Sequence, residues 1–163
     1  MKISMSYEEY KKLEEISLNL IEQYHKDDVD KGGNPYKNHL VSVSSVCNSY
    51  EAKIAGLLHD IIEDTQCDEE VLLNAGVPNY IIDIILLVTR KENESYSDFI
   101  TRIEQSNNIF AMELKCSDLK NNCDLSRLKN ASEEVIKKAE KRIKKRYIPA
   151  LIRLENKLKE LNK

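Results

Sequence analysis

The sequence is poor in the residues that punctuate β-structure, with only four glycines and three prolines in 163 residues. A sandwich or barrel of many short strands needs such residues at turns spaced roughly 8–12 positions apart. The sequence also lacks any apolar run near the length of about 18 residues that a transmembrane helix requires. Helices are therefore the expected structure, and the length predicts one compact domain over residues 1–163.

A strong charge of one sign is also absent. Twenty-five Lys and Arg residues stand against 28 Asp and Glu, for a formal net charge of −3. Nucleic-acid binding needs a basic surface and often an aromatic stacking platform. Tryptophan is absent, and the other aromatics are two Phe and eight Tyr. We therefore expect no nucleic-acid partner. The oligomeric state is not specified by any pattern in the sequence.

Signals for export and for disulfides are missing as well. The first residues, MKISMSYEEYKK, turn acidic where a signal peptide would need an apolar segment. We therefore expect a cytoplasmic protein without a membrane partner. No C-x-x-C pair occurs, so the cysteines are expected to be reduced, buried thiols rather than metal or redox sites. They are Cys47, Cys67, Cys116 and Cys123.

Apolar periodicity and capping residues predict about eight helices. Ser6 and Glu9 have capping-box spacing at the start of the first helix, which should end near Asp27 or Asp28. Asp68 and Gly76 bound a short helix. The other helices are expected at about 36–47, 51–64, 79–89, 95–105, 109–121 and 132–163, the last with a kink at Pro149.

The predicted helix at 51–64 has an unusual polar face, formed by His59, Asp60, Glu63 and Asp64. Burying an imidazole and a carboxylate without partners costs several kcal/mol each, and a bound cation would offset that cost. Neighbouring positions on a helix diverge by about 100°. His59 and Asp60 can therefore share one ion only in a bent geometry, with further ligands from other helices. His39 and Asp118 are the candidates.

Three blocks of the sequence resemble a known family. GLLHDIIEDT is similar to the signature of HD-superfamily metal-dependent phosphohydrolases, specifically the hydrolase domain of RelA/SpoT-type (p)ppGpp enzymes and their small single-domain relatives. GGNPYKNH resembles the upstream G-x-P-Y-x-x-H element, and LKCSDLKNNCDLSRL the downstream K-x-A-D-R-L-H-N-M block. The motif-bearing core spans about 25–147, with a charged helix at about 132–163. The resemblance implies an all-α bundle around a metal site.

The resemblance also implies the metal centre and its chemistry. Glu63 and Asp64 match the acidic pair that orients and deprotonates the attacking water. Imidazole with carboxylate suits Mn²⁺ or Fe²⁺, and the family precedent is manganese. The implied metal ligands are His39, His59, Asp60 and Asp118.

Substrate contacts are less well matched to the family pattern. Where the family has a base-contacting arginine, this sequence has Asp30, or the cation is displaced to Lys31, and Asn121 replaces the histidine of H-N-M. The lysine-rich last helix is either a solvated face or a phosphate contact through Arg142 and Arg146. The substrate-binding candidates are Lys31, Tyr36, Arg90, Asn122 and Arg146.

The function expected from these features is metal-dependent hydrolysis of a phosphate or pyrophosphate ester of a small nucleotide. The first candidate is a (p)ppGpp 3′-pyrophosphohydrolase-like activity. The altered base-contacting position favours one alternative, a phosphohydrolase of another small nucleotide or dinucleotide. A separate alternative is a non-catalytic sensor that binds metal or nucleotide, against which the retained Glu63 and Asp64 argue.

Overall fold

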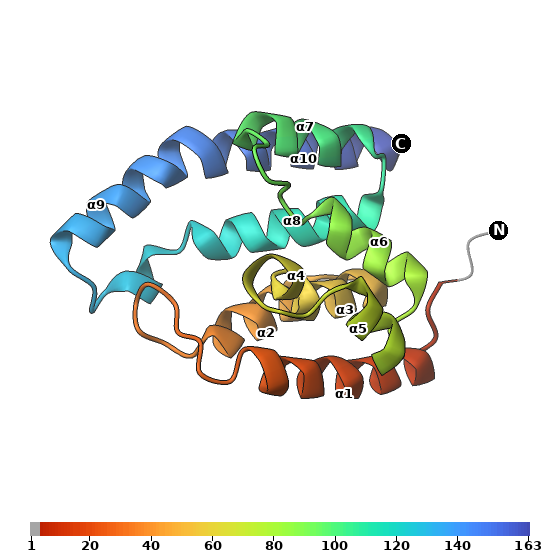
Figure 1. The fold of residues 1–163 in the computed structure, drawn as a ribbon. Helices are drawn as coiled ribbons and strands as arrows, with labels where there is room; N and C mark the ends of the chain where they lie inside the picture. Colours follow the sequence, from red (N-terminus) through yellow and green to blue (C-terminus); the bar gives the residue numbers. More distant parts are fainter. Residues whose placement is uncertain (1–3) are drawn as a thin grey trace.

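The structure is a computed structural model that describes residues 4–163, and this part of the chain is an all-helical bundle (Figure 1). None of the described helices combines the length and the apolar character that a membrane span needs. The α-helices are α1 (Tyr7–Tyr24), α2 (Tyr36–Val46), α3 (Tyr50–Leu58), α4 (Ile61–Asp64), α5 (Glu69–Ala75), α6 (Asn79–Leu87), α7 (Tyr96–Gln105), α8 (Ile109–Asn122), α9 (Glu133–Arg142) and α10 (Ile148–Leu161). A 3₁₀ helix, η1 (Leu125–Leu128), precedes α9, and a π-helical segment, η2 (Ile143–Tyr147), joins α9 to α10.

The predicted capping residues begin and end the helices as expected. The Ser6 hydroxyl accepts the Glu9 N–H, and the Glu9 carboxylate accepts the Ser6 N–H, which completes a capping box. Asp68 caps α5, and Gly76 ends it with a φ of +104°, in the left-handed region that favours glycine. The first helix ends at Tyr24, earlier than predicted.

Two predicted helices are interrupted in the structure. The region 51–64 divides into α3 and α4 because the backbone leaves the regular helix at His59 and Asp60. In the last helix the irregular segment is η2, ahead of the predicted kink at Pro149. Pro149 has no N–H for the preceding turn, and its place in the first turn of α10 is one that tolerates proline. With each interrupted pair counted as one region, the described residues form the eight helical regions that were predicted.

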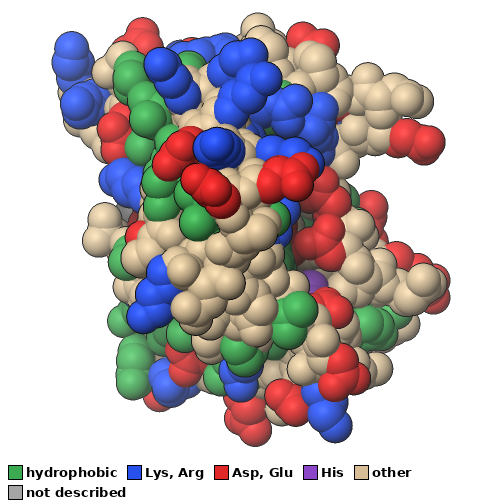
Figure 2. Space-filling view, turned by 90° about the vertical axis from the view of Figure 1, so that its left-hand side faces the viewer, with side chains coloured by type: hydrophobic (Ala, Val, Ile, Leu, Met, Phe, Trp, Pro, Cys, Tyr) green, Lys and Arg blue, Asp and Glu red, His purple; other side chains and the backbone are tan. Residues whose placement is uncertain are grey.

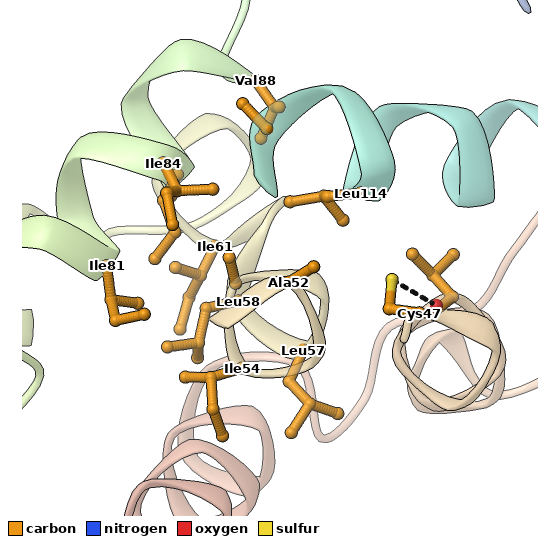
Figure 3. Close-up of a cluster of buried hydrophobic side chains, with 14 of the residues drawn as sticks. Cys47, Ala52, Ile54, Leu57, Leu58, Ile61, Ile81, Ile84, Val88 and Leu114 are labelled. Carbon is orange, nitrogen blue, oxygen red and sulfur yellow. Dashed lines mark hydrogen bonds between the residues drawn. The ribbon is translucent and has the colours of Figure 1, made fainter. Parts of the chain in front are cut away.

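The core is built around α3, which packs against α1, α2, α6 and α8 (Figure 1). Its apolar side chains meet those of α6, as Figure 3 shows for Leu58, Ile81 and Ile84. The predicted apolar helix at 79–89 is therefore a core helix. The four cysteines form no disulfide, and three of them are buried, whereas Cys123 is only partly buried. The tight packing of α3 gives His59, at its end, a fixed position.

We predict that Leu58→Ala destabilises the fold, because Leu58 is fully buried between α3 and its neighbours. The expected loss in unfolding free energy is about 2–5 kcal/mol, measured by urea denaturation. Ile152→Ala is the control, since this α10 side chain is 54% exposed and should lose less than about 0.5 kcal/mol. Equal losses in the two variants would contradict the position of the core.

Candidate functional site

The turn between α3 and α4 brings two neighbouring polar side chains to one point. His59 ends α3 in a near-helical conformation, and Asp60 follows at φ −102° and ψ −1°. This backbone bend places His59 Nε2 3.1 Å from Asp60 Oδ2. On a regular helix the two side chains would point about 100° apart. The bent geometry that a shared ligand requires is therefore present.

Two further helices contribute side chains to the same point. His39 from α2 has its Nε2 3.2 Å from Asp118 Oδ1, on α8, and 3.8 Å from Asp60 Oδ2. His59 Nε2 lies 3.3 Å from the same Asp118 oxygen. The ligand-type atoms of His39, His59 and Asp60 all lie within 4.8 Å of one another. The four residues predicted as ligands are thus brought together, and we call them the His/Asp centre.

Hydrogen bonds outside the centre determine which nitrogen of each imidazole faces it. His59 Nδ1 lies 2.6 Å from the Gly56 carbonyl, and His39 Nδ1 lies 2.7 Å from Asn121 Oδ1. Both partners are acceptors, so each Nδ1 carries the proton. Asn121 Oδ1 also accepts from Arg127 Nη1, which determines the orientation of the amide. Each Nε2 therefore faces the centre, and the neutral form of each imidazole would present its Nε2 lone pair there.

These lone pairs face carboxylate oxygens, an arrangement that a cation would stabilise. His59 Nε2 is buried and makes no hydrogen bond among the described residues. Burial lowers the pKa of His59, but the charges of Asp60 and Asp118 outweigh it and hold the pKa well above its usual value. This balance reflects a strongly negative potential at the centre. Imidazole nitrogens with carboxylate oxygens are a suitable donor set for a divalent transition metal.

Neighbouring side chains keep the two carboxylates charged. Asp118 Oδ2 accepts from Lys115 Nζ at 2.8 Å, and its Oδ1 accepts from Asn122 Nδ2 at 3.0 Å. Although burial raises the pKa of Asp118, Lys115 and His59 lower it well below the usual value. Tyr36 donates its hydroxyl to Asp60 Oδ2 at 2.5 Å.

Lys115 is a buried cation beside the centre that the sequence analysis did not single out. Burial lowers its pKa, but Asp118 more than compensates, so the pKa lies above the usual value and the ammonium stays protonated. Its Nζ also lies 5.1 Å from the centroid of the Phe99 ring. Lys115 stands at the lysine position of the K-x-A-D block, and this position in the motif could have marked it as a site residue from the sequence.

Glu63 and Asp64 lie on α4, just beyond the centre. Both side chains are exposed, and they follow a bend rather than continuing the face of one helix, which corrects the predicted arrangement at 51–64. The pKa of each is raised, first by partial loss of water around the carboxyl and then by the charge of Asp60. A raised carboxyl pKa makes each group a better proton acceptor near neutral pH.

A cavity of about 450 Å³ opens beside the centre. Figure 2 looks at this side of the molecule and shows a histidine within a hollow, with Lys and Arg side chains gathered above it. Three of the predicted substrate contacts line this cavity, namely Lys31, Tyr36 and Asn122. Arg90 and Arg146 do not, because their guanidinium groups lie 5.9 and 5.6 Å from the centroid of the Tyr96 ring.

Arg127, on η1, also lines the cavity, and no sequence pattern marked it. Its Nη1 donates to Asn121 Oδ1 at 2.8 Å and its Nη2 to Asp30 Oδ2 at 3.2 Å. The other Asp30 oxygen accepts the N–H groups of Gly32 and Asn34, both at 2.9 Å. Asp30 is therefore committed to anchoring Arg127. The same arginine reaches His39 through Asn121, so the loop before α2 is connected to the centre.

A close backbone approach holds this loop against η1. An added Cβ on Gly32 would lie 2.0 Å from the carbonyl oxygen of Arg127, and Asn34 Nδ2 donates to the same oxygen at 3.3 Å. Only glycine fits at position 32 without moving one of the two backbones. The neighbouring Gly33 has a φ of +81°, but nothing lies near its missing side chain.

We predict that Gly32→Ala separates the loop from η1 and pulls Arg127 away from Asp30. The expected cost is about 1–3 kcal/mol of unfolding free energy, together with a shift in the imidazole NMR signals of His39. Gly33→Ala is the control, with an expected backbone cost of about 1–2 kcal/mol and unchanged His39 signals. Unchanged His39 signals in Gly32→Ala would contradict the connection from loop to centre.

No protein-family model matches the chain, and no curated protein is significantly similar to it. Among solved structures, it is similar to a metazoan ortholog of SpoT that hydrolyses ppGpp and plays a role in starvation responses. The TM-score is 0.62 at 20% sequence identity, and the similarity covers 98% of this chain and 96% of that chain. The two chains share a fold. The all-α fold predicted from the three sequence blocks, that of the RelA/SpoT-type hydrolase domain, is thereby confirmed.

Proposed function

We propose that the chain is a metal-dependent phosphohydrolase of a small nucleotide, with (p)ppGpp as the first candidate substrate. The observation that carries the proposal is the His/Asp centre, where two imidazole Nε2 lone pairs and two carboxylates converge beside a cavity of about 450 Å³. The shared fold with a ppGpp hydrolase supports the choice of substrate class.

The residues of the centre fit a divalent cation, and His39, His59, Asp60 and Asp118 would hold it. Mn²⁺ is the first candidate, with Fe²⁺ as the alternative, because mixed imidazole and carboxylate donors suit both ions. Such a cation supplies Lewis-acid polarisation of a phosphoryl oxygen and a lowered pKa for bound water. The hydrogen bonds from His39 to Asn121 and from His59 to Gly56 orient the ligands.

Charge at the centre also suits a phosphate substrate. With a cation bound, both imidazoles would be neutral, so the two carboxylates and the Lys115 ammonium would contribute one net negative charge. A divalent cation would then leave the centre with one positive charge, which attracts a polyanionic phosphate group. Lys115 is held in place by its 2.8 Å contact to Asp118.

The chain's own residues have distinct roles in this proposal. Glu63 and Asp64 follow Asp60 on α4 and do not themselves line the cavity; in this proposal they take the proton of the attacking water, consistent with their raised pKa. Tyr36 orients Asp60 through its hydroxyl, and Asn122 and Lys31 contact the nucleotide from the cavity wall. Water attacks the phosphorus joined to the 3′ oxygen, and the bond between that phosphorus and the 3′ oxygen breaks. The 3′ oxygen takes up a proton, and pyrophosphate carrying the oxygen of the water is released. Arg90 and Arg146 do not line the cavity, so neither contacts the phosphate group at the centre in this proposal.

A second candidate substrate is another small nucleotide or a dinucleotide. The observation that favours it is Asp30, whose two oxygens are occupied by Arg127 and by backbone N–H groups. The base-contacting arginine of the resembling family is thus replaced by a carboxylate that is not available to a base. The same His/Asp centre would serve either substrate. A non-catalytic sensor remains the third alternative.

The substrate is tested by measuring pyrophosphate and orthophosphate release from a nucleotide panel that includes ppGpp, with Mn²⁺ and with EDTA. We expect Mn²⁺-dependent pyrophosphate release from ppGpp and none in EDTA. Faster release from another nucleotide would favour the second candidate. Metal binding without release from any nucleotide would leave only the sensor.

We predict that His59→Ala and Glu63→Gln differ in what they lose. His59→Ala removes a ligand, so both Mn²⁺ affinity and turnover should fall by at least about a hundredfold. Glu63→Gln keeps the ligands, so Mn²⁺ affinity should stay within about twofold while turnover falls by about 10²–10⁴-fold. Titration calorimetry with Mn²⁺ and the release assay measure the two quantities. A fully active Glu63→Gln would rule out its part in activating water.

A further inference from the structure

One face of α9 and η2 carries five Lys and Arg side chains and no other type of side chain. The four that follow Lys138 lie three, four, seven and eight positions after it, a spacing that puts all five on one side of a helix. They surround a second hollow of about 360 Å³, next to the cavity. We call this surface the cationic face, and Lys and Arg side chains gather at this place in Figure 2. Its members are Lys138, Lys141, Arg142, Lys145 and Arg146.

The fold gains no stability from this concentration of charge. Like charges four positions apart on a helix repel, as in Lys138 with Arg142 and Lys141 with Lys145. Lys138 pairs with Glu134 at 3.1 Å, whereas Lys141, Arg142 and Lys145 have no ion pair among the described residues. A helix C-terminus would favour cations, but here the chain continues through η2 into α10. The repulsion is therefore uncompensated within the described chain.

The cationic face is continuous with the candidate active site, because Arg142 lines both hollows. Lys31, from the loop before α2, lines the cavity together with Arg142. Burial and then the charge of Arg142 lower the pKa of Lys31, as expected for two cations that line the same cavity. Lys31 also has no ion pair among residues 4–163. Arg142 therefore extends the positive charge of the cavity, where Lys31 also lies, to the second hollow.

We infer that the cationic face binds a linear polyphosphate group, namely the second phosphate group of a substrate whose first group lies at the His/Asp centre. Ammonium and guanidinium groups are the side chains that bind phosphate oxygens, and the lining contains no apolar or aromatic side chain for a base. The part of this inference that makes the bound phosphate group a part of the substrate rests on the proposed function. A separate polyphosphate would present the same chemistry, and the experiment distinguishes the two sources.

Binding is tested first with inorganic tripolyphosphate and titration calorimetry. The variant is Lys141→Gln with Lys145→Gln, and the matched control is Lys137→Gln with Lys144→Gln, which removes the same charge outside the hollow. We expect affinity to fall at least tenfold in the variant and less than twofold in the control. An equal loss in both pairs, or no binding to the unmodified protein, would overturn the inference. Circular dichroism verifies that both pairs fold.

Kinetics then identify the source of the polyphosphate. With ppGpp as substrate, Lys141→Gln with Lys145→Gln should raise KM about tenfold at unchanged kcat, and with guanosine 3′-diphosphate KM should not change. The variant could instead bind tripolyphosphate more weakly and yet have the same KM for ppGpp as the unmodified protein. That result would mean that the cationic face binds a separate polyphosphate, and it would overturn the assignment of the face to the substrate. Selective tripolyphosphate binding by a protein inactive on every nucleotide would support the face while the proposed function fails.

Discussion

The structure depends on a break in one helix, at the turn between α3 and α4. A regular helix would separate His59 from Asp60, and the His59 Nε2 would face Asp118 alone. The bend directs both side chains to Asp118 and His39, so a segment that packs the core on one side supplies the polar centre on the other. The apolar contacts of α3 with α1, α2, α6 and α8 hold this turn in place.

Burial of charge explains most of the surroundings of the centre. Two carboxylates and two imidazole lone pairs in a dry site need compensation. The fold supplies part of it through Lys115, Tyr36 and Asn122, each of which donates a hydrogen bond to a carboxylate oxygen. Within residues 4–163, His59 Nε2 remains without a hydrogen bond, and a divalent cation would satisfy it. A bound divalent cation would therefore both stabilise the buried polar groups of the centre and serve the proposed reaction.

The wall of the cavity differs from the family pattern in a coordinated way. Asp30 replaces an arginine, and an arginine from η1, Arg127, occupies the space beside it and bonds to it. Asn121, which replaces a histidine, accepts from both Arg127 and His39. The two departures noted in the sequence are thus joined through one guanidinium group. This wall, together with the cationic face on α9 and η2, is where the substrate preference of this chain would be determined.

The sequence by itself determined the helical fold, most helix boundaries and the residues that meet at the centre. Those features depend on local signals, such as the caps Ser6 and Asp68, or on the three motif blocks around His39, His59 and Asp118. Only the tertiary structure decided the break at Asp60, the separation of Arg90 and Arg146 from the cavity, and the contact of Arg127 with Asp30, 97 positions away. These depend on how distant segments pack, and helical periodicity carries no information about contacts at such separations.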